Sequence, residues 1–200
     1  VMDWDADFLA FSAHKMVGPT GVGVLYGKYD LLEMMDAYML GGGSNARFDV
    51  CGNILLKKSP YKFEAGTPAI EAVLGFEAAV KYLMSIGMEN IHSYEQELRT
   101  YLVEKLKKLD HIHLYNPNTD TGIITFNVKD IFAQDAASYI NANKIAVRAG
   151  NHCAKILMEV LQTSETIRAS LYFYNTYEEI DEFIRVVGEI TLEKCVELYV

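Results

Sequence analysis

Lys15 stands where a short apolar run gives way to a loop rich in glycine and proline, in the stretch FSAHKMVGPTG at residues 11–21. A lysine amine that loses its proton near neutral pH can form a Schiff base with a carbonyl compound. Ser12, His14 and the following glycines could bind a phosphate, since small residues let backbone N–H groups approach an anion. A lysine on the protein surface fits the same local sequence.

Cys153 is the cysteine whose surroundings favour reactivity. It lies in VRAGNHCAKIL, between an expected strand and an expected helix, beside His152 and near Arg148 and Lys155. Positive charge and a helix N-terminus stabilise a thiolate, which is the nucleophilic form of cysteine. An inert buried cysteine fits the local sequence equally well.

Arg168 interrupts a run of residues, TIRASLYFYNT, that otherwise suits a buried strand. An arginine in such a place needs an anionic partner. The partner is either a structural carboxylate of the protein or the carboxylate of a substrate, which a guanidinium can bind through two parallel hydrogen bonds. The sequence leaves both alternatives open.

Composition narrows the classes of function. Half of the 200 residues are apolar, which allows a packed core, and the net charge of −9 disfavours nucleic acid as a partner. We find no apolar run long enough to span a membrane and no signal peptide, so we expect a soluble, cytoplasmic protein. The three cysteines are too far apart for a disulfide framework. His111 and His113 lack a third metal ligand, so we predict no metal site.

The elements around Lys15 form the first part of the chain. Apolar patterning predicts a strand that ends at Ser12 and a second strand over residues 21–28, which flank the lysine loop. A helix-like segment follows and stops at the glycines of residues 41–43. The long connection over residues 44–67 suggests a role in covering a site or contacting another subunit. Thr67 is the expected N-cap of a helix that ends at Gly87.

The second part of the chain alternates strands and helices. We expect a helix from Met88 to Leu109, a final helix from Thr176, and a polar hairpin over residues 118–122. Further strands are expected at residues 111–117, 122–128, 144–150 and 167–174, and shorter helices at residues 135–142 and after Asn151. The pattern predicts an α/β and α+β chain with two domains, 1–86 and 87–200. The second contains a mostly antiparallel sheet covered by helices on one face.

Four motifs carry a resemblance to a known family. FSAHKMVGPTGVGVLYG, FEAGTP, VRAGNHCA and IRASLYFYNT occur in the order and approximate spacing of cysteine desulfurases and selenocysteine lyases, in the class V aminotransferase group of fold-type I pyridoxal-phosphate enzymes. Essentially the whole chain resembles the C-terminal half of such an enzyme, and its motifs are similar to the SUF-type branch. The resemblance implies the end of a large cofactor-binding domain over residues 1–86 and the small C-terminal domain over residues 87–200.

The resemblance also implies how the cofactor is held. Lys15 matches the Schiff-base lysine of the family, which also moves the proton at the substrate Cα. Ser12 and His14 match residues that contact the phosphate of pyridoxal 5′-phosphate. Thr67 matches a position that reaches the phosphate of the neighbouring subunit, which implies a homodimer with a shared site.

The remaining implied roles concern the substrate. Arg168 matches the arginine that binds the α-carboxylate of L-cysteine, and Arg148 is expected to assist it. Cys153 matches the nucleophile that takes the substrate's sulfur as a persulfide and leaves L-alanine. The sulfur would then pass to an acceptor protein for iron–sulfur cluster assembly.

The chain departs from the family pattern in three ways. Ala13 replaces a glycine, which is tolerated unless the backbone there needs a positive φ. Residues 45–61 look unlike the relatives. By the resemblance, the ring-stacking histidine and the aspartate that pairs with the pyridine nitrogen lie upstream of Val1. We therefore expect that the chain is cut from a longer protein, and that alone it is inactive and binds the cofactor weakly or not at all.

Two alternatives remain at this point. The same scaffold fits a selenocysteine lyase or another class V aminotransferase-like enzyme, in which Cys153 matters less. In the other alternative, the chain is a non-catalytic interaction module that docks a partner through residues 44–67.

Overall fold

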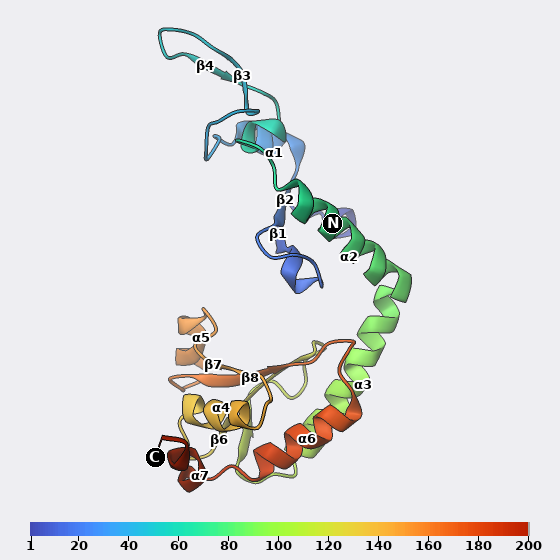
Figure 1. Cartoon of the computed structure of the whole chain (residues 1–200), viewed down its shortest axis with the longest axis vertical. Helices are drawn as coiled ribbons and strands as arrows, with labels where there is room; N and C mark the ends of the chain where they lie inside the picture. The colour runs from blue at the N-terminus through green and yellow to red at the C-terminus, as the bar shows by residue number, and fades with distance from the viewer. Residues whose placement is uncertain (200) are drawn as a thin grey trace. The chain divides into compact units, whose positions relative to one another are not determined.

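The computed structural model describes residues 1–199, and the chain divides into two compact units, Val1–Ile86 and Gly87–Val200. Figure 1 shows the elements of both units along the chain. No helix within the described residues is long and apolar enough to cross a membrane.

The first unit begins with the two strands that flank Lys15. After a 3₁₀ turn at Met2–Trp4, β1 (Phe8–Ser12) pairs antiparallel with β2 (Gly23–Gly27), and η2 (Ala13–Lys15) starts the loop between them. The predicted pair of strands is therefore present, and the lysine lies at the end where the two strands diverge into the loop.

The helix after β2 is shorter than its apolar sequence predicts. α1 runs over Tyr29–Met34, and Met35 already has extended backbone. Lys62 helps to end it, because its Nζ donates hydrogen bonds of 2.9 Å to the backbone carbonyls of Glu33 and Met35. Lys62 is only 7% exposed, and the two carbonyl oxygens are the partners of its buried ammonium group. In a longer helix the same carbonyls would accept backbone N–H groups instead.

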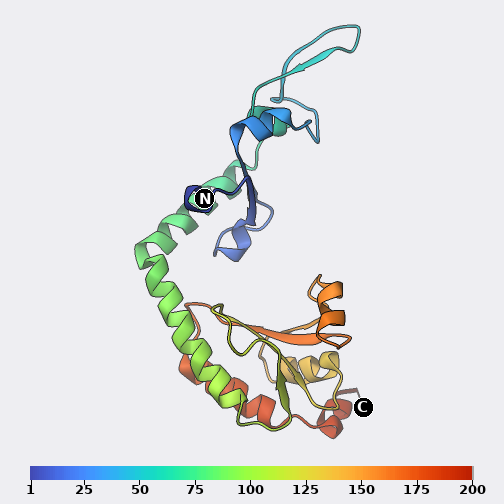
Figure 2. The same ribbon diagram turned by 180° about the vertical axis from the view of Figure 1, so that it is seen from behind.

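The long connection contains a β-hairpin. β3 (Asn45–Phe48) pairs antiparallel with β4 (Ile54–Leu56), and a 3₁₀ turn, η3 (Tyr61–Phe63), follows. The carboxylate of Asp49 closes the hairpin by accepting hydrogen bonds from the backbone of Cys51 and Asn53. The hairpin extends away from the rest of its own unit in both Figure 1 and Figure 2.

The predicted N-cap at Thr67 is wrong. α2 covers Ile70–Ile86, so it begins three residues after Thr67, and the N–H of Ile70 bonds the carbonyl of Pro68 in a turn that precedes the helix. The predicted stop is correct, because Gly87 has a φ of 92°, which interrupts the helix. Thr67 is therefore an exposed residue of the connection rather than part of a helix cap.

The second unit contains a four-stranded antiparallel sheet in the order β5-β6-β8-β7. The elements are α3 (Met88–Leu106), β5 (Ile112–Leu114), β6 (Ile123–Val128), α4 (Ala133–Ala142), β7 (Arg148–Gly150), α5 (Lys155–Val160), β8 (Thr166–Ser170), α6 (Tyr177–Gly188), α7 (Leu192–Val196) and η4 (Glu197–Tyr199).

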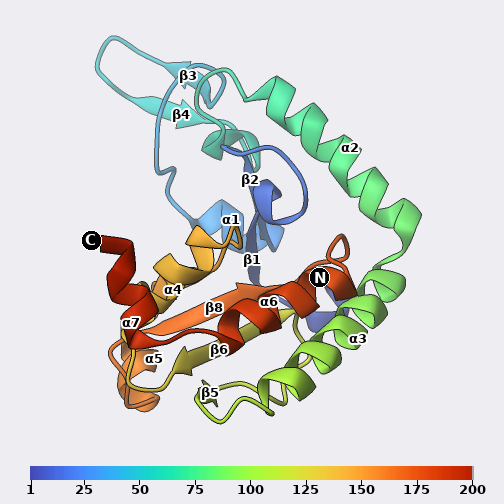
Figure 3. The same cartoon turned by 60° about the horizontal axis from the view of Figure 1, so that its bottom comes forward.

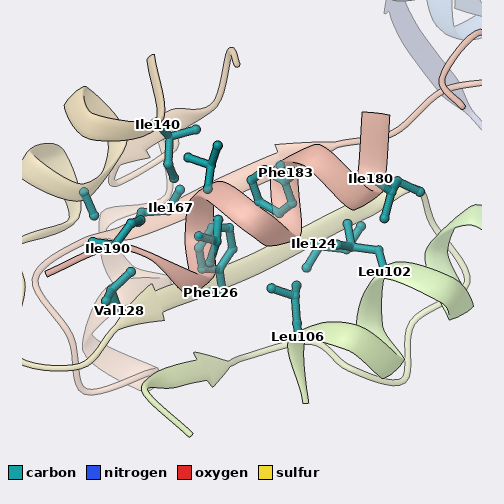
Figure 4. Packing of buried hydrophobic residues seen from close by; sticks show 14 of the residues in the cluster. Leu102, Leu106, Ile124, Phe126, Val128, Ile140, Ile167, Ile180, Phe183 and Ile190 are labelled. Carbon is teal, nitrogen blue, oxygen red and sulfur yellow. The ribbon is translucent and has the colours of Figure 1, made fainter. Parts of the chain in front are cut away.

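One face of this sheet carries the core. Alternate residues of β6 and β8 point to that face, where α3, α4 and α6 supply the other apolar side chains (Figure 4). Phe126 packs edge-on against Phe183 with ring centroids 5.9 Å apart. Figure 3 shows α6 lying across the strands. The predicted antiparallel sheet is confirmed, and α3, α4 and α6 cover one face as expected, but the short α5 lies on the other side.

Two strands and one helix are shorter than predicted. β7 begins only at Arg148, and Lys144, with a φ of 65°, still belongs to the turn that ends α4. β8 ends at Ser170, because Asn175 draws the chain into a turn in which its side chain accepts the N–H of Tyr172. α3 ends at Leu106, where the chain turns toward β5.

The opposite face of the sheet is polar around β8. Arg168 alternates with the buried Ile167 and Ala169, so it points away from the helical core. The register places Arg148 and Thr125 on either side of Arg168. α5 lies on this side, opposite α4, in Figures 1 and 2. The fold thus gathers polar side chains beside the segment that contains Cys153.

Candidate active site

The lysine loop is fastened to the protein at Ala13. This residue is fully buried, its N–H bonds the carbonyl of Val22 at 3.1 Å, and its carbonyl accepts the N–H groups of Met16 (2.8 Å) and Gly18 (3.0 Å). Positive φ angles in the loop fall at Val17 and Gly21 and not at Ala13. Alanine in place of the family's glycine is therefore compatible with the backbone here.

A small pocket lies beside Lys15. It has a volume of about 340 Å³ and is lined by Ala10, Phe11, Ser12, Lys15 and Met16. Lys15 is exposed, and among the described residues 1–199 its amine has no hydrogen bond or ion pair. An unengaged primary amine next to a serine hydroxyl fits a ligand that carries an aldehyde and an anionic group. His14 is also exposed, next to Lys15 in η2.

Gly18 supports this loop, and its substitution gives a first prediction. A Cβ at Gly18 would lie 2.9 Å from the backbone oxygen of Ala13 and 2.9 Å from the ring of Phe76. We expect Gly18→Ala to destabilise the protein by about 1–3 kcal/mol, measured by urea unfolding. If Lys15 holds pyridoxal phosphate, as the resemblance implies, the substitution should also weaken that binding in a titration. Gly42→Ala is the matched control, because its added methyl group meets no heavy atom within 4 Å. Equal effects of the two substitutions would contradict this prediction.

Thr67 is not brought to Lys15 by the structure. It is exposed and follows Gly66, whose N–H bonds the carbonyl of Gly42. Within the described part of the first unit, no hydrogen bond joins Thr67 to the lysine loop. Its contact with the phosphate of a neighbouring subunit stays a prediction.

The cysteine loop is a tight turn between β7 and α5. The N–H of Ala154 bonds the carbonyl of Asn151 at 2.8 Å, and both residues between them have positive φ: 53° at His152 and 61° at Cys153. Cys153 is exposed. It precedes the first residue of α5 by two positions, and α5 has only six residues. The helix dipole therefore contributes less to the thiol than the sequence suggested.

Two arginines lie beside this turn. Arg148 Nη2 donates to Cys153 Sγ at 3.6 Å, and β7 pairs Arg148 directly with Arg168 on β8. Like charges on opposite positions of neighbouring strands repel each other. Nε of Arg168 is buried without a hydrogen-bond partner, and neither arginine has an ion pair within the described chain. Of the two partners considered for Arg168, a ligand carboxylate therefore fits better than a structural one.

His152 has a role that its sequence position did not indicate. Its Nε2 lies 3.0 Å from the carbonyl oxygen and 2.9 Å from Oγ1 of Thr166. A carbonyl only accepts, so Nε2 carries the hydrogen. Burial lowers the pKa of His152, and the charges of Arg168 and Arg148 lower it further. The expectation that His152 adds positive charge near the thiol is therefore corrected: the ring is neutral and binds β8.

Protonation of His152 gives a second prediction. The unfolded chain takes up this proton at the ordinary histidine pKa of about 6.5, whereas the folded protein resists it. We therefore expect stability to be highest above that pH and to fall as the pH decreases below it. Urea midpoints at about pH 7.5 and about pH 5.5 test this, with His152→Gln as the variant that cannot titrate. The variant should lose less stability on acidification, and an equal loss would contradict the assignment.

The geometry thus yields two sets of residues, one in each unit. Ser12 and Lys15 share a pocket, and His14 adjoins them. His152, Cys153, Arg148 and Arg168 gather on the polar side of the second sheet. Among residues 1–199 no group of His, Cys, Asp or Glu is arranged to hold a metal ion.

Comparisons with known proteins identify the family of the chain. The family model for aminotransferase class-V matches residues 1–183. A probable cysteine desulfurase of Staphylococcus aureus is 44% identical over 194 residues, covering 94% of this chain and 46% of the relative. The chain therefore spans about half the length of the curated relatives it matches.

Solved structures give the same result. A cysteine desulfurase of Escherichia coli, solved as its S-sulfonic acid, has a TM-score of 0.89 at 33% identity, covering 99% of this chain and 48% of that one. An apo cysteine desulfurase of Thermococcus onnurineus also has a TM-score of 0.89, at 36% identity, covering 94% and 48%. The predicted fold, part of a pyridoxal-phosphate transferase, is thereby confirmed.

Pyridoxal 5′-phosphate is a cofactor used in this family. The free amine of Lys15, the hydroxyl of Ser12 beside it and the open pocket fit such a group. The matched family model, the curated relatives and the shared fold lead to one conclusion: this chain belongs to the aminotransferase class-V family, among sequences similar to cysteine desulfurases.

Proposed function

We propose that this chain forms the C-terminal part of a pyridoxal-phosphate-dependent cysteine desulfurase. The enzyme would convert L-cysteine to L-alanine and carry the removed sulfur as a persulfide on Cys153. One observation carries the proposal: an exposed thiol lies 3.6 Å from Arg148, on the same side of the sheet as Arg168, whose buried Nε has no partner. A soft nucleophile beside an unpaired carboxylate-binding group is what sulfur removal from an amino acid requires.

Lys15 is the proposed covalent anchor and proton carrier. Its Nζ would hold the cofactor through the cofactor's aldehyde and, when free, would move the proton at the substrate Cα. When bound, the cofactor supplies an electron sink for this carbon. Ser12 and His14 would bind the phosphate, so that the ring is fixed and the amine meets the substrate in one orientation.

Arg168 would bind the α-carboxylate of L-cysteine. The guanidinium is planar and presents two parallel N–H donors, which match the two carboxylate oxygens. Its Nε is buried and unpaired, so a bound carboxylate replaces a missing partner rather than competing with an existing one. Arg148, directly opposite on β7, adds a second positive charge.

Cys153 would perform the sulfur transfer. Its thiolate attacks the sulfur of the substrate, so that an S–S bond forms while the Cβ–S bond breaks. The electron pair of the broken bond goes to Cβ, which takes up a proton and becomes the methyl group of L-alanine. Because Cys153 is exposed on a turn, the persulfide can be handed to an acceptor protein.

The remaining features of the proposal concern assembly. The whole protein would be a cytoplasmic homodimer that serves iron–sulfur cluster assembly, with Thr67 reaching the phosphate of the second subunit. The exposed position of Thr67, ahead of α2, is compatible with a contact outside its own chain. The division of the chain at Gly87 would correspond to the end of the large domain and the start of the small one.

Product analysis tests the proposed reaction. The full-length protein that contains this chain, supplied with pyridoxal phosphate, a reductant and L-cysteine, should release L-alanine and sulfide in equal amounts. L-Selenocysteine as the second substrate separates the proposal from a selenocysteine lyase. Release of selenide without any sulfide from L-cysteine would overturn the assignment as a cysteine desulfurase.

A further inference from the structure

We infer that His152 is a positioning residue that holds Cys153 in its reactive place by tying the turn over residues 151–154 to Thr166. This inference rests on the proposed function of Cys153. Within residues 1–199 the His152 ring bonds Thr166 and not the Cys153 thiol, so its effect on the thiol passes through the backbone.

The turn needs such a tie because its conformation is unfavourable for its sequence. His152 and Cys153 are consecutive and both have positive φ, a region that residues with a Cβ rarely adopt. Glycine, asparagine and aspartate are the usual residues in turns of this kind. A strained backbone of two residues persists only where the surrounding structure holds it in place.

Thr166 holds the turn from two directions. It is fully buried at the start of β8 and pairs in register with Gly150, the last residue of β7. The carbonyl and the hydroxyl oxygen of Thr166 also accept a hydrogen bond from Nε2 of His152, which lies two residues after Gly150. The same buried residue therefore fixes both the entry to the turn and its middle.

The consequence falls on the thiol. Cys153 follows His152 directly, and the turn leaves Sγ within 3.6 Å of Arg148, which starts β7. If the His152 tie is cut, the turn can relax to negative φ and the thiol moves away from the guanidinium. Nδ1 of His152 is buried with no hydrogen-bond partner among residues 1–199, which is costly for a residue that only fills space.

The experiment compares three variants in the full-length protein: His152→Ala, His152→Gln and Thr166→Val. The glutamine amide can still donate to the Thr166 carbonyl, whereas valine removes only the hydroxyl. The first readout is the rate of iodoacetamide alkylation at Cys153, followed by mass spectrometry of its peptide. The second is the rate of sulfide release from L-cysteine. His92→Ala is the matched control, an exposed histidine on α3.

We expect His152→Ala to slow sulfide release by about tenfold or more, because displacement of a reacting group by about 1 Å costs up to about 100-fold. Alkylation should also slow, because the displaced thiol leaves the positive charge of Arg148, which favours its nucleophilic form. His152→Gln should recover most of the loss, and KM for L-cysteine should change little, since Arg168 is untouched. Wild-type alkylation in a folded His152→Ala protein would overturn the inference. So would a glutamine variant no better than alanine. If the His152→Ala protein fails to fold, the other two variants decide. Wild-type rates of alkylation and sulfide release in His152→Gln, with slower rates in Thr166→Val, support the role of the His152–Thr166 hydrogen bond. Any other result overturns it.

The alkylation arm separates this inference from the proposed function. It measures the position and reactivity of the thiol without any desulfurase chemistry. Normal sulfide release by a Cys153→Ala protein would refute the proposed function. The alkylation rates would still test whether the His152–Thr166 hydrogen bond positions Cys153.

Discussion

Replacing Cys153 by alanine in the full-length protein is expected to lower sulfide release from L-cysteine by at least about 100-fold. The alanine has no sulfur to form the new S–S bond, and no other exposed cysteine lies on the polar side of the second sheet among residues 1–199: Cys51 is in the β3–β4 hairpin and Cys195 is buried. Coenzyme binding should be unchanged, because Lys15 is in the other unit.

Sulfide release and the visible spectrum of the bound coenzyme measure the two parts of this prediction. Cys51→Ala is the matched control, since Cys51 is an exposed thiol at the hairpin tip with no proposed part in the reaction. A Cys153→Ala protein that releases sulfide at the rate of the Cys51→Ala protein would show that the persulfide role is wrong.

Replacing Lys15 by alanine should have the larger effect, with a loss of turnover of about 1,000-fold or more. The substitution removes both the covalent anchor and the proposed carrier of the Cα proton. Lys15→Arg should be nearly as damaging, because it keeps the positive charge but cannot form the covalent bond. Since Lys15 is exposed and unpaired in the described chain, neither change should disturb folding.

Turnover of L-cysteine and thermal unfolding measured on the same samples test this prediction. Lys81→Ala is the matched control, an exposed lysine on α2 that forms an ion pair with Glu77 one turn away. Substantial activity in a folded Lys15→Ala protein would remove Lys15 from the mechanism.

The features that the sequence predicted well depend on neighbours in the chain. The two strands around Lys15 pair with each other, and the second begins and ends at glycine, so the local pattern was sufficient. Arg168 stood out because it interrupts an apolar alternation, and the structure places it on the polar face of β8 for the same reason. The family resemblance added the roles, which the local sequence had left open between a chemical and a structural interpretation.

The features that were missed depend on contacts far apart in the sequence. His152 meets Thr166 across 14 positions, and no local pattern predicts that the ring is neutral and tied to β8. Lys62 meets the end of α1 across 27 positions, which is why the apolar segment after residue 34 did not continue as helix. Thr67 is a residue type that often caps helices, but the turn at Pro68 places the start of α2 three residues later, at Ile70.

The central claim is that the coenzyme is covalently bound to the amine of Lys15. Borohydride reduction of the full-length holoprotein makes such a bond permanent, and peptide mass mapping then locates it. We expect the added mass of the reduced coenzyme on the peptide that contains Lys15, and its loss in the Lys15→Arg protein. A label on a different lysine, or the same label pattern after Lys15 has been replaced, would show that Lys15 does not hold the coenzyme.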